Sequence, residues 1–318
     1  MFRFLILGVA CLVGGFSFAD ESPGVPLAQP PSGNSVIRGP AGNSEIVITT
    51  TDRLAGAIHS LRWNDREFID SHDHGRQLQS AASFDCALPQ EFWAECYNPT
   101  EAGSRLDGAG DRSTSKLLSL TAEGAELRST TQMAFWLAPG ELSSGRPALN
   151  HQTLSEHFIS KRVHIGYKQL PNVIEYEVTF TVPAGERHTL AQFEGVTGYM
   201  PPEFNRFWKF IPESGQLEEL SDGPGEQKYP VVLATENGTH AMGVFSPDQP
   251  SRGYESAGYG RFRFPAEQVV KWNCVFRVRS PTEITPGPYR FRQFVVVGTL
   301  ADVQESLSVL AAEFAASE

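Results

Sequence analysis

Cysteine is scarce in this sequence. Only four cysteines occur among 318 residues, and they form neither a CxxC pair nor a cysteine–histidine pattern with zinc-finger spacing. This argues against the small folds that depend on such patterns. Cys86 and Cys96 flank one short loop, and two interpretations of them stay open: a disulfide, which an exported chain can form, or two buried thiols.

Clusters of basic residues are also missing. Lysine and arginine total 26 against 37 aspartates and glutamates, which gives a formal net charge of −11. An acidic chain without a basic patch repels a phosphate backbone, so nucleic acid is not expected as a partner. Neutral sugars and cationic ligands remain compatible with this charge.

Long apolar runs are absent after the first residues, so no membrane span is expected. The one early run, Phe4 to Val13, follows a single arginine and is shorter than the roughly 20 residues of a membrane span. Small residues then lead to Ala19, an arrangement typical of a secretory signal peptide over residues 1–19. A lipid anchor on Cys11 is the weaker alternative. We therefore expect an exported protein, periplasmic or extracellular.

Several familiar catalytic and nucleotide-binding motifs do not occur. The sequence contains no GxSxG elbow, no HExxH, no phosphate-binding GxxxxGK[ST] and no GxGxxG in a strand–helix context. These absences argue against the common serine hydrolases, zinc proteases and nucleotide-binding enzymes. No cofactor and no metal are expected.

Composition divides the chain into three parts, of which the expected signal peptide over residues 1–19 is the first. Residues 20–44 are rich in proline, glycine and serine, and we expect a flexible lead there. No second linker of that kind follows, so residues 45–318 are expected to form a single domain.

The body of the chain is patterned as strands separated by turn residues. Between residues 173 and 182, apolar side chains alternate with glutamate and threonine, as in a half-buried strand. Similar patterns predict strands over residues 45–50, 55–63, 116–121, 127–137, 156–166, 229–235, 240–246, 270–280 and 289–299. So many strands cannot remain one open flat sheet, and they must close or stack in two layers. The sequence predicts an all-β protein, a large antiparallel β-sandwich.

One helix is expected, at the C-terminus. Thr299 and Asp302 have the spacing of a capping box. Val303, Leu307 and Leu310 then recur at helical spacing, and Phe314 continues the stripe, so the helix is expected to pack on a sheet.

The polar run from His72 to Gln79 is treated as a strand, in which His72, His74 and Arg76 point to one side. Two histidines on one face can bind a metal, but the arginine beside them disfavours a cation. A pocket for a sugar suits these donors better. The alternative is an exposed polar edge strand.

A second polar segment is the loop over residues 95–113. Tyr97 or Trp93 could stack on a sugar ring, and Asn98 and Glu101 could bind its hydroxyls. A plain surface loop is the alternative, and a calcium loop lacks the late glutamate that an EF-hand needs.

Two further segments carry candidate acid and base groups. On the strand over residues 156–166, Arg162 and His164 share a face, and the arginine favours a neutral imidazole. Glu194 lies in an apolar, aromatic run with Tyr199 downstream, and its expected partners are Arg76, Arg162 or His164. The alternative is a structural ion pair between two strands.

A large twisted β-sandwich behind a signal peptide, with His, Arg and Glu side chains on its strands, resembles the galactose mutarotase-like fold, also called a supersandwich. The resemblance covers roughly residues 45–300 at the level of architecture. It implies a carbohydrate-active or carbohydrate-binding protein. Epimerases with this fold use a histidine acid and a glutamate base.

These observations lead to three hypotheses. The first is a carbohydrate-active enzyme, an epimerase, glycoside hydrolase or lyase, with a sugar ligand that the arginines slightly favour as acidic. Its expected catalytic groups are His164 or His74 as acid and Glu194 as base; its expected substrate contacts are Arg76, Arg162, Tyr97, Asn98, Glu101 and Tyr199. The second is a sugar-binding envelope protein without catalysis. The third is a structural or interaction protein without a small-molecule site.

Overall fold

The alternation between residues 173 and 182 forms strand β12 (Leu170–Val182), whose apolar side chains are buried and whose glutamates are half-buried. The computed structural model describes residues 31–247, 255 and 257–315. All ten segments expected to contain a strand do so. The described residues therefore confirm an antiparallel all-β sandwich with a C-terminal helix.

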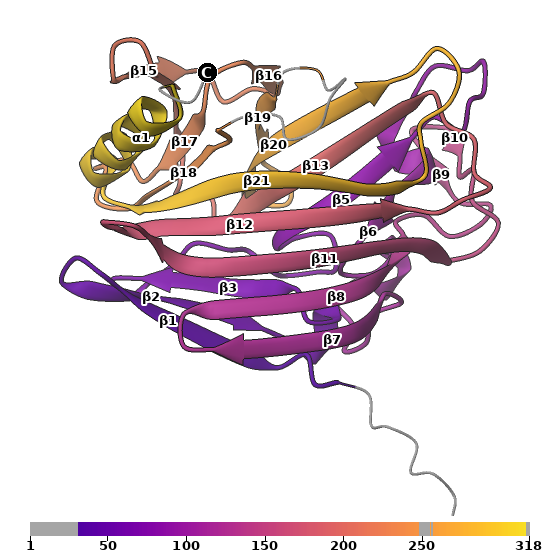
Figure 1. Cartoon of the computed structure of the whole chain (residues 1–318), viewed down its shortest axis with the longest axis horizontal. Helices are drawn as coiled ribbons and strands as arrows, with labels where there is room; N and C mark the ends of the chain where they lie inside the picture. The colour runs from indigo at the N-terminus through magenta and orange to yellow at the C-terminus, as the bar shows by residue number, and fades with distance from the viewer. Residues whose placement is uncertain (1–30, 248–254, 256, 316–318) are drawn as a thin grey trace, which may run out of the picture. The chain divides into compact units, whose positions relative to one another are not determined.

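The long strands form two antiparallel layers (Figure 1). The first layer, called the β11 sheet, has the order β7 (Lys116–Glu123), β8 (Glu126–Phe135), β11 (Leu154–Tyr167), β12, β21 (Gly287–Gly298), β18 (Ala241–Phe245), β17 (Val231–Ala234), β14 (Arg206–Ile211) and β15 (Gln216–Leu220). The second layer, called the β13 sheet, has the order β1 (Ser35–Ala41), β2 (Ser44–Thr50), β3 (Ile58–Trp63), β5 (Leu78–Phe84), β13 (Leu190–Met200), β20 (Val269–Arg279), β19 (Gly258–Phe264) and β16 (Gly225–Gln227).

A two-residue strand joins the two layers. β6 (Pro99–Thr100) pairs with β5 of the β13 sheet on one side and with β8 of the β11 sheet on the other. The remaining short strands are β4 (Arg66–Glu67), which pairs with β3, and the pair β9 (Leu142–Ser143) and β10 (Arg146–Pro147). Three 3₁₀ turns complete the fold: η1 (Asp52–Leu54), η2 (Ala94–Tyr97) and η3 (Arg105–Asp107).

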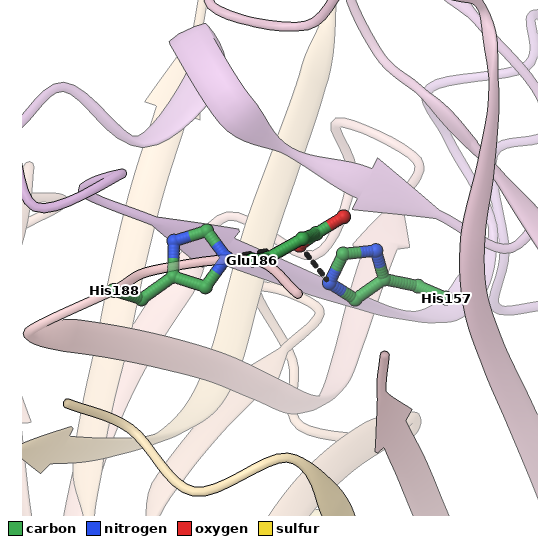
Figure 2. Close-up of side chains that lie close together, drawn as sticks. All are labelled: His157, Glu186 and His188. Carbon is green, nitrogen blue, oxygen red and sulfur yellow. Dashed lines mark hydrogen bonds and ion pairs between the residues drawn. The ribbon is translucent and has the colours of Figure 1, made fainter. Parts of the chain in front are cut away.

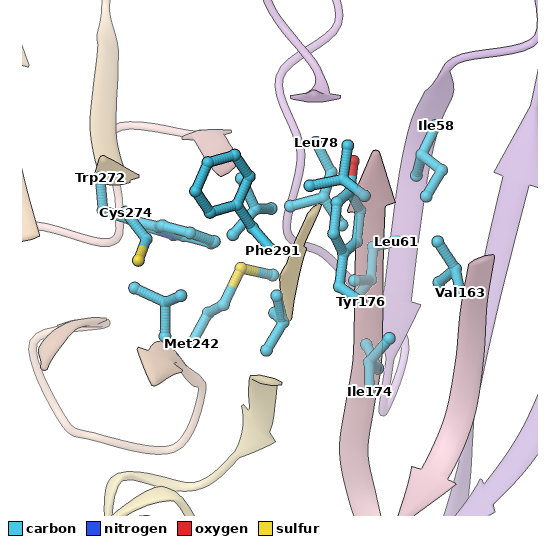
Figure 3. Close-up of a cluster of buried hydrophobic side chains, with 14 of the residues drawn as sticks. Ile58, Leu61, Leu78, Val163, Ile174, Tyr176, Met242, Trp272, Cys274 and Phe291 are labelled. Carbon is cyan, nitrogen blue, oxygen red and sulfur yellow. The ribbon is translucent and has the colours of Figure 1, made fainter. Parts of the chain in front are cut away.

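The main core fills the space between the two layers (Figure 3). Trp272 and Cys274 of β20 point toward Met242 of β18 and Phe291 of β21, and all four are essentially inaccessible to solvent. The apolar face of each long strand thus packs against the opposite sheet, as in other two-layer β folds. The opposite face of each strand is left for helix α1, for loops or for solvent.

Helix α1 (Leu300–Ala315) covers part of the outer face of the β11 sheet, over β18 and β21. Val303, Leu307 and Leu310 are fully buried there, and Phe314 packs against the same cluster, as the helical spacing predicted. The capping box is also present. Asp302 accepts hydrogen bonds from the Thr299 amide at 2.9 Å and hydroxyl at 2.7 Å, and its own amide donates to Thr299 Oγ1.

We expect Thr299→Ala to lower the free energy of unfolding by about 1 kcal/mol, because it removes the hydroxyl that caps the first turn of α1. Urea denaturation measures the change. Glu305→Ala, on the exposed face of the same helix, is the matched control and should stay within roughly 0.5 kcal/mol of the parent. Equal effects of the two substitutions would contradict a role for the cap.

Ordered structure begins earlier than the sequence predicted. Strand β1 lies inside the proline-rich stretch that we expected to be flexible as far as residue 44. It pairs with β2 along its whole length through a two-residue turn, in which Gly42 has a positive φ of 63°. A Gly-Asn pair between two such segments is a hairpin signal.

The prediction of a strand over the whole run from His72 to Gln79 is wrong. Residues 72–77 form bends and turns, and β5 begins only at Leu78. Asp73 causes the difference, because its carboxylate accepts the Gly75 amide hydrogen bond at 2.9 Å, and its carbonyl accepts from the Gln77 side chain. A short side chain that bonds its own backbone favours a turn over a strand.

Cys86 and Cys96 are free thiols. Burial, followed by the charges of Glu186 and Asp85, raises the pKa of Cys86 to about 12, so this thiol is protonated at neutral pH.

Across the described residues, no helix has both the length and the apolar character that crossing a membrane requires.

Candidate functional site

The outer face of the β13 sheet carries a polar floor in its middle three strands. β5 contributes Gln79 and Ser83, β13 contributes Glu194 and Tyr199, and β20 contributes Lys271. A cavity of about 290 Å³ lies over this floor; we call it the polar cleft. Its lining residues are His74, Gly75, Gln79, Ala81, Ser83, Trp93, Ala94, Glu95, Asn98, Thr100, Trp136, Glu194, Tyr199 and Lys271. Its size is close to the lower end of the range of small-ligand sites.

A bulge in β13 sets the geometry of the floor. The register of β13 against β20 shifts between Glu194 and Val196, and Thr197 Oγ1 donates to Glu194 Oε2 at 2.6 Å, three residues away. The bulge needs glycine at position 195, because a Cβ atom there would lie only 2.5 Å from the Gln293 side chain. The bulge therefore turns the carboxylate and the hydroxyl toward one another.

Lys271 holds the floor together. It lies directly across from Tyr199 in the strand register, and its Nζ is 3.2 Å from Glu194 Oε2 and 5.2 Å from the centre of the Tyr199 ring. Only 13% of the lysine side chain and 18% of the glutamate side chain are exposed. The ion pair is thus shielded from water while it still faces the cleft.

The protonation states of the floor follow from these contacts. Burial alone would raise the pKa of Glu194, but the charge of Lys271 and hydrogen bonds from Thr197, Lys271 and Asn273 outweigh it and lower the pKa below its usual value. Burial, with the nearby Glu194 charge, raises the pKa of Tyr199 against the opposing effect of Lys271. At neutral pH the floor therefore presents a carboxylate, an ammonium and a neutral phenol.

Two indole rings form the walls of the cleft. Trp93 precedes η2 and is 37% exposed; its Nε1 donates to Ser143 Oγ at 3.0 Å, and the Ser143 hydroxyl donates to Glu95. The half-buried Trp136 follows β8 and reaches the turn at Gly75, where a Cβ atom would lie 2.7 Å from the ring. Both rings are thus fixed by contacts with neighbouring segments.

Four of the residues expected to form the site line the polar cleft: His74, Asn98, Glu194 and Tyr199. The imidazole of His74 is engaged by the backbone, because Nδ1 lies 2.7 Å from the Gly108 carbonyl and Nε2 lies 2.8 Å from the Arg53 carbonyl. His74 therefore has no free ring nitrogen to offer a ligand. The side-chain amide of Asn98 donates to the Ala82 carbonyl at 2.6 Å.

Arg162 and His164 lie elsewhere, on the outer face of the β11 sheet. Arg162 bonds Glu126 at 2.7 Å and Glu175 at 2.8 Å, and these hydrogen bonds raise its pKa although partial burial opposes them. His164 Nδ1 is 2.9 Å from the Gly166 carbonyl. A second hollow there, of about 410 Å³, is lined by Arg128, Ser160, Lys161, Arg162, Glu177, Val178, Thr179, Arg290, Phe291 and Arg292.

The other three expected contacts are engaged away from the cleft. Glu101 is buried and pairs with Lys161 at 2.8 Å. Arg76 pairs with Asp73 at 3.1 Å and with Asp70 at 3.5 Å. The Tyr97 hydroxyl bonds Glu186, and neither Tyr97 nor Arg76 is among the residues that line the cleft.

The expected partners of Glu194 were wrong. Lys271, rather than Arg76, Arg162 or His164, neutralises this carboxylate. The strand that carries Lys271 was predicted, and its alternation sets Lys271 and Asn273 opposite the apolar Val270, Trp272 and Cys274. That strand pattern marks Lys271 as outward-facing, but it does not say that this strand lies beside β13.

Comparison with protein-family models and with curated proteins gives no match. Solved structures to which this chain is similar include the Slr1438 protein from Synechocystis sp. PCC 6803, at 8% identity and a TM-score of 0.45, with 83% of this chain and 96% of that chain covered. A heparan sulfate lyase HepC mutant from Pedobacter heparinus has 8% identity and a TM-score of 0.41, with 84% of this chain and 35% of that chain covered. An alpha-galactosidase from Lactobacillus brevis has 11% identity and a TM-score of 0.41, with 88% and 41% covered. The chain thus spans well under half the length of the last two proteins.

Proposed function

We propose that this chain is an exported carbohydrate-active protein that binds a sugar or oligosaccharide in the polar cleft. The observation that carries the proposal is the composition of that cleft, in which two fixed indoles face a floor of carboxylate, ammonium, phenol and amide groups. A sugar ring offers an apolar face that stacks on an aromatic ring and hydroxyls that bond polar groups. A rigid sheet carries the floor, so the donors and acceptors are held in place before the ligand arrives.

The charge of the cleft indicates the class of sugar. Glu95 and Glu194 supply two carboxylates and Lys271 supplies one ammonium, while the arginines that would favour an acidic sugar lie outside it. The net charge around the ligand is therefore negative, which disfavours uronates and sulfated sugars. The proposed ligand is neutral.

Sugar chemistry in the same cleft is a second candidate function. Glu194 is held ionised and Tyr199 is held protonated beside the same ammonium, which gives a proton acceptor and a proton donor in one place. These groups take the roles that the sequence assigned to Glu194 and to a histidine. Because Lys271 lowers the pKa of Glu194, the carboxylate is a weak base, and this favours binding over catalysis.

We expect Trp93→Ala and Trp136→Ala each to weaken sugar binding by about fivefold, because each removes a stacking surface worth roughly 1 kcal/mol. A panel of neutral and acidic oligosaccharides, titrated by calorimetry, measures the change. Arg162→Gln is the control, since Arg162 lies on the other sheet. Binding that survives both tryptophan substitutions but is lost in Arg162→Gln would move the ligand site to the arginine-lined hollow.

The same panel separates a binder from an enzyme. Anomer ratio, reducing ends and unsaturated uronate absorbance report epimerisation, hydrolysis and elimination. Turnover that is lost in both Glu194→Gln and Tyr199→Phe would support the second candidate. Binding with no change in any of the three readouts would leave the first.

A further inference from the structure

A second polar cluster lies inside the sandwich, apart from the polar cleft. His157, Glu186 and His188 each present one nitrogen or oxygen atom, and these three atoms lie within 4.8 Å of one another. Figure 2 shows both imidazole rings turned toward the Glu186 carboxylate from opposite sides. None of these residues was a candidate in the sequence, because His157 on β11 is about thirty residues away from the turn that carries Glu186 and His188.

The strand order explains why they meet. His157 is on the inward face of β11, the face that also carries Ile159 and Val163. Glu186 and His188 lie in the turn between β12 and β13, and β13 belongs to the opposite sheet. The cluster therefore ties one end of the β11 sheet to the β13 sheet.

The contacts within the cluster are short and shielded from solvent. Glu186 Oε2 is 2.9 Å from His188 Nε2 and 3.3 Å from His157 Nε2, and each histidine side chain is no more than 3% exposed. Phe84 packs on both rings, at centroid distances of 4.9 Å and 4.6 Å. The Tyr97 hydroxyl donates to the same glutamate.

Protein groups alone leave the cluster unsatisfied. Among the described residues, His157 Nδ1, His157 Nε2 and His188 Nδ1 are buried without a hydrogen-bond partner, since the 3.3 Å contact of His157 with Glu186 lacks hydrogen-bond geometry. Buried polar atoms normally have partners, so His157 Nε2, which lies 3.3 Å from the Glu186 carboxylate, calls for an ion or a water molecule beside it.

We propose that His157, Glu186 and His188 bind one zinc ion. Two imidazole nitrogens and one carboxylate oxygen are a ligand set that zinc takes in proteins, with a water molecule as the fourth ligand. Tetrahedral bonds of about 2.0–2.1 Å place the ligand atoms roughly 3.4 Å apart, which is close to the two contact distances to Glu186 Oε2 in the cluster. Tyr97 donates to the ligating carboxylate and supports it from outside the coordination sphere.

The zinc ion would act as a structural tie. It joins β11 to the turn before β13, and through Tyr97 it also holds η2, the segment that carries Glu95 of the polar cleft. Metal binding of this kind contributes directly to folding free energy. The zinc proposal does not depend on which ligand the cleft binds.

Metal analysis of the full exported chain tests the proposal. We expect about one zinc per chain after purification without chelators, and a thermal midpoint that falls by at least about 3 °C after chelator treatment and recovers with added Zn²⁺. His157→Gln and His188→Gln should both lose the metal. His151→Gln, an exposed histidine six residues before His157, should keep it.

A cobalt titration of the chelator-treated parent protein covers the case in which the histidine variants do not fold. Tetrahedral nitrogen and oxygen ligation should give visible Co²⁺ absorption that saturates near one equivalent and is displaced by Zn²⁺. A folded parent protein that binds neither ion above about 0.1 equivalents would overturn the proposal. Metal binding that persists unchanged in folded His157→Gln and His188→Gln would overturn it as well.

Discussion

Lys161→Met is expected to lower the free energy of unfolding by about 3–5 kcal/mol, because it leaves a buried carboxylate without its counter-charge. Lys161 Nζ lies 2.8 Å from one oxygen of Glu101 and 2.9 Å from the other. The two side chains are only 3% and 2% exposed. Burial raises the pKa of Glu101, and Lys161 opposes this rise, so removal of the ammonium makes the ionised form still less favourable.

Urea denaturation of a small set of variants measures this effect. Lys209→Met is the matched control, because Lys209 pairs with Glu218 at the same 2.8 Å but on the surface, where such pairs contribute about 0–1 kcal/mol. The double variant Glu101→Leu/Lys161→Met should recover much of the loss, since no unpaired charge remains. A loss in Lys161→Met as small as that in Lys209→Met would show that Glu101 is not held as a buried ion.

Lys271→Met is expected to lower the free energy of unfolding by about 2–4 kcal/mol at pH 7, and by much less near pH 4. In the parent protein, the pKa of Glu194 lies below its ordinary value of 4.5. The stability that this carboxylate contributes is therefore present above pH 4.5 and is lost as the pH falls through the lowered pKa.

The effect of pH on the stability contribution of Glu194 reverses in sign when the Lys271 ammonium is removed. Burial is the largest influence on Glu194, and without Lys271 it is expected to raise the pKa of this carboxyl above 4.5. Ionised Glu194 then penalises the folded state at pH 7, and the penalty is relieved as the pH falls through the raised pKa. Denaturation of parent and variant at pH 7 and pH 4 measures the difference. If the difference in free energy of unfolding between parent and variant were equal at both pH values, Glu194 would not be its cause.

The layered fold was predictable because alternation is a local property of the chain. The strand β12 and the cap at Thr299 follow directly from neighbouring residues, and both are present as expected. The turn at Asp73 was missed because its side chain competes with the strand for the backbone. Here a single short polar residue outweighed the pattern around it.

The site was less predictable because it depends on which face of a strand points inward. On β11, Arg162 and His164 alternate with Lys161 and Val163, and the apolar members place the second set inside. The arginine face was taken as the functional face, whereas the inward face carries the buried pair of Lys161 and, nearer the strand's start, His157. The pairing of β13 with β20, which brings Lys271 to Glu194, spans more than seventy residues and leaves no local signal.

The short strand β6 has a consequence for how tightly the polar cleft can hold a ligand. Asn98 immediately precedes β6, and β6 is bonded to β5 on one side and to β8 on the other. The segment that carries Asn98 is thereby hydrogen-bonded to both layers, and it can move outward only if those hydrogen bonds break. Under the proposed function, a sugar that enters the cleft meets a frame already in its bound shape, so little of its interaction energy is spent on ordering the protein.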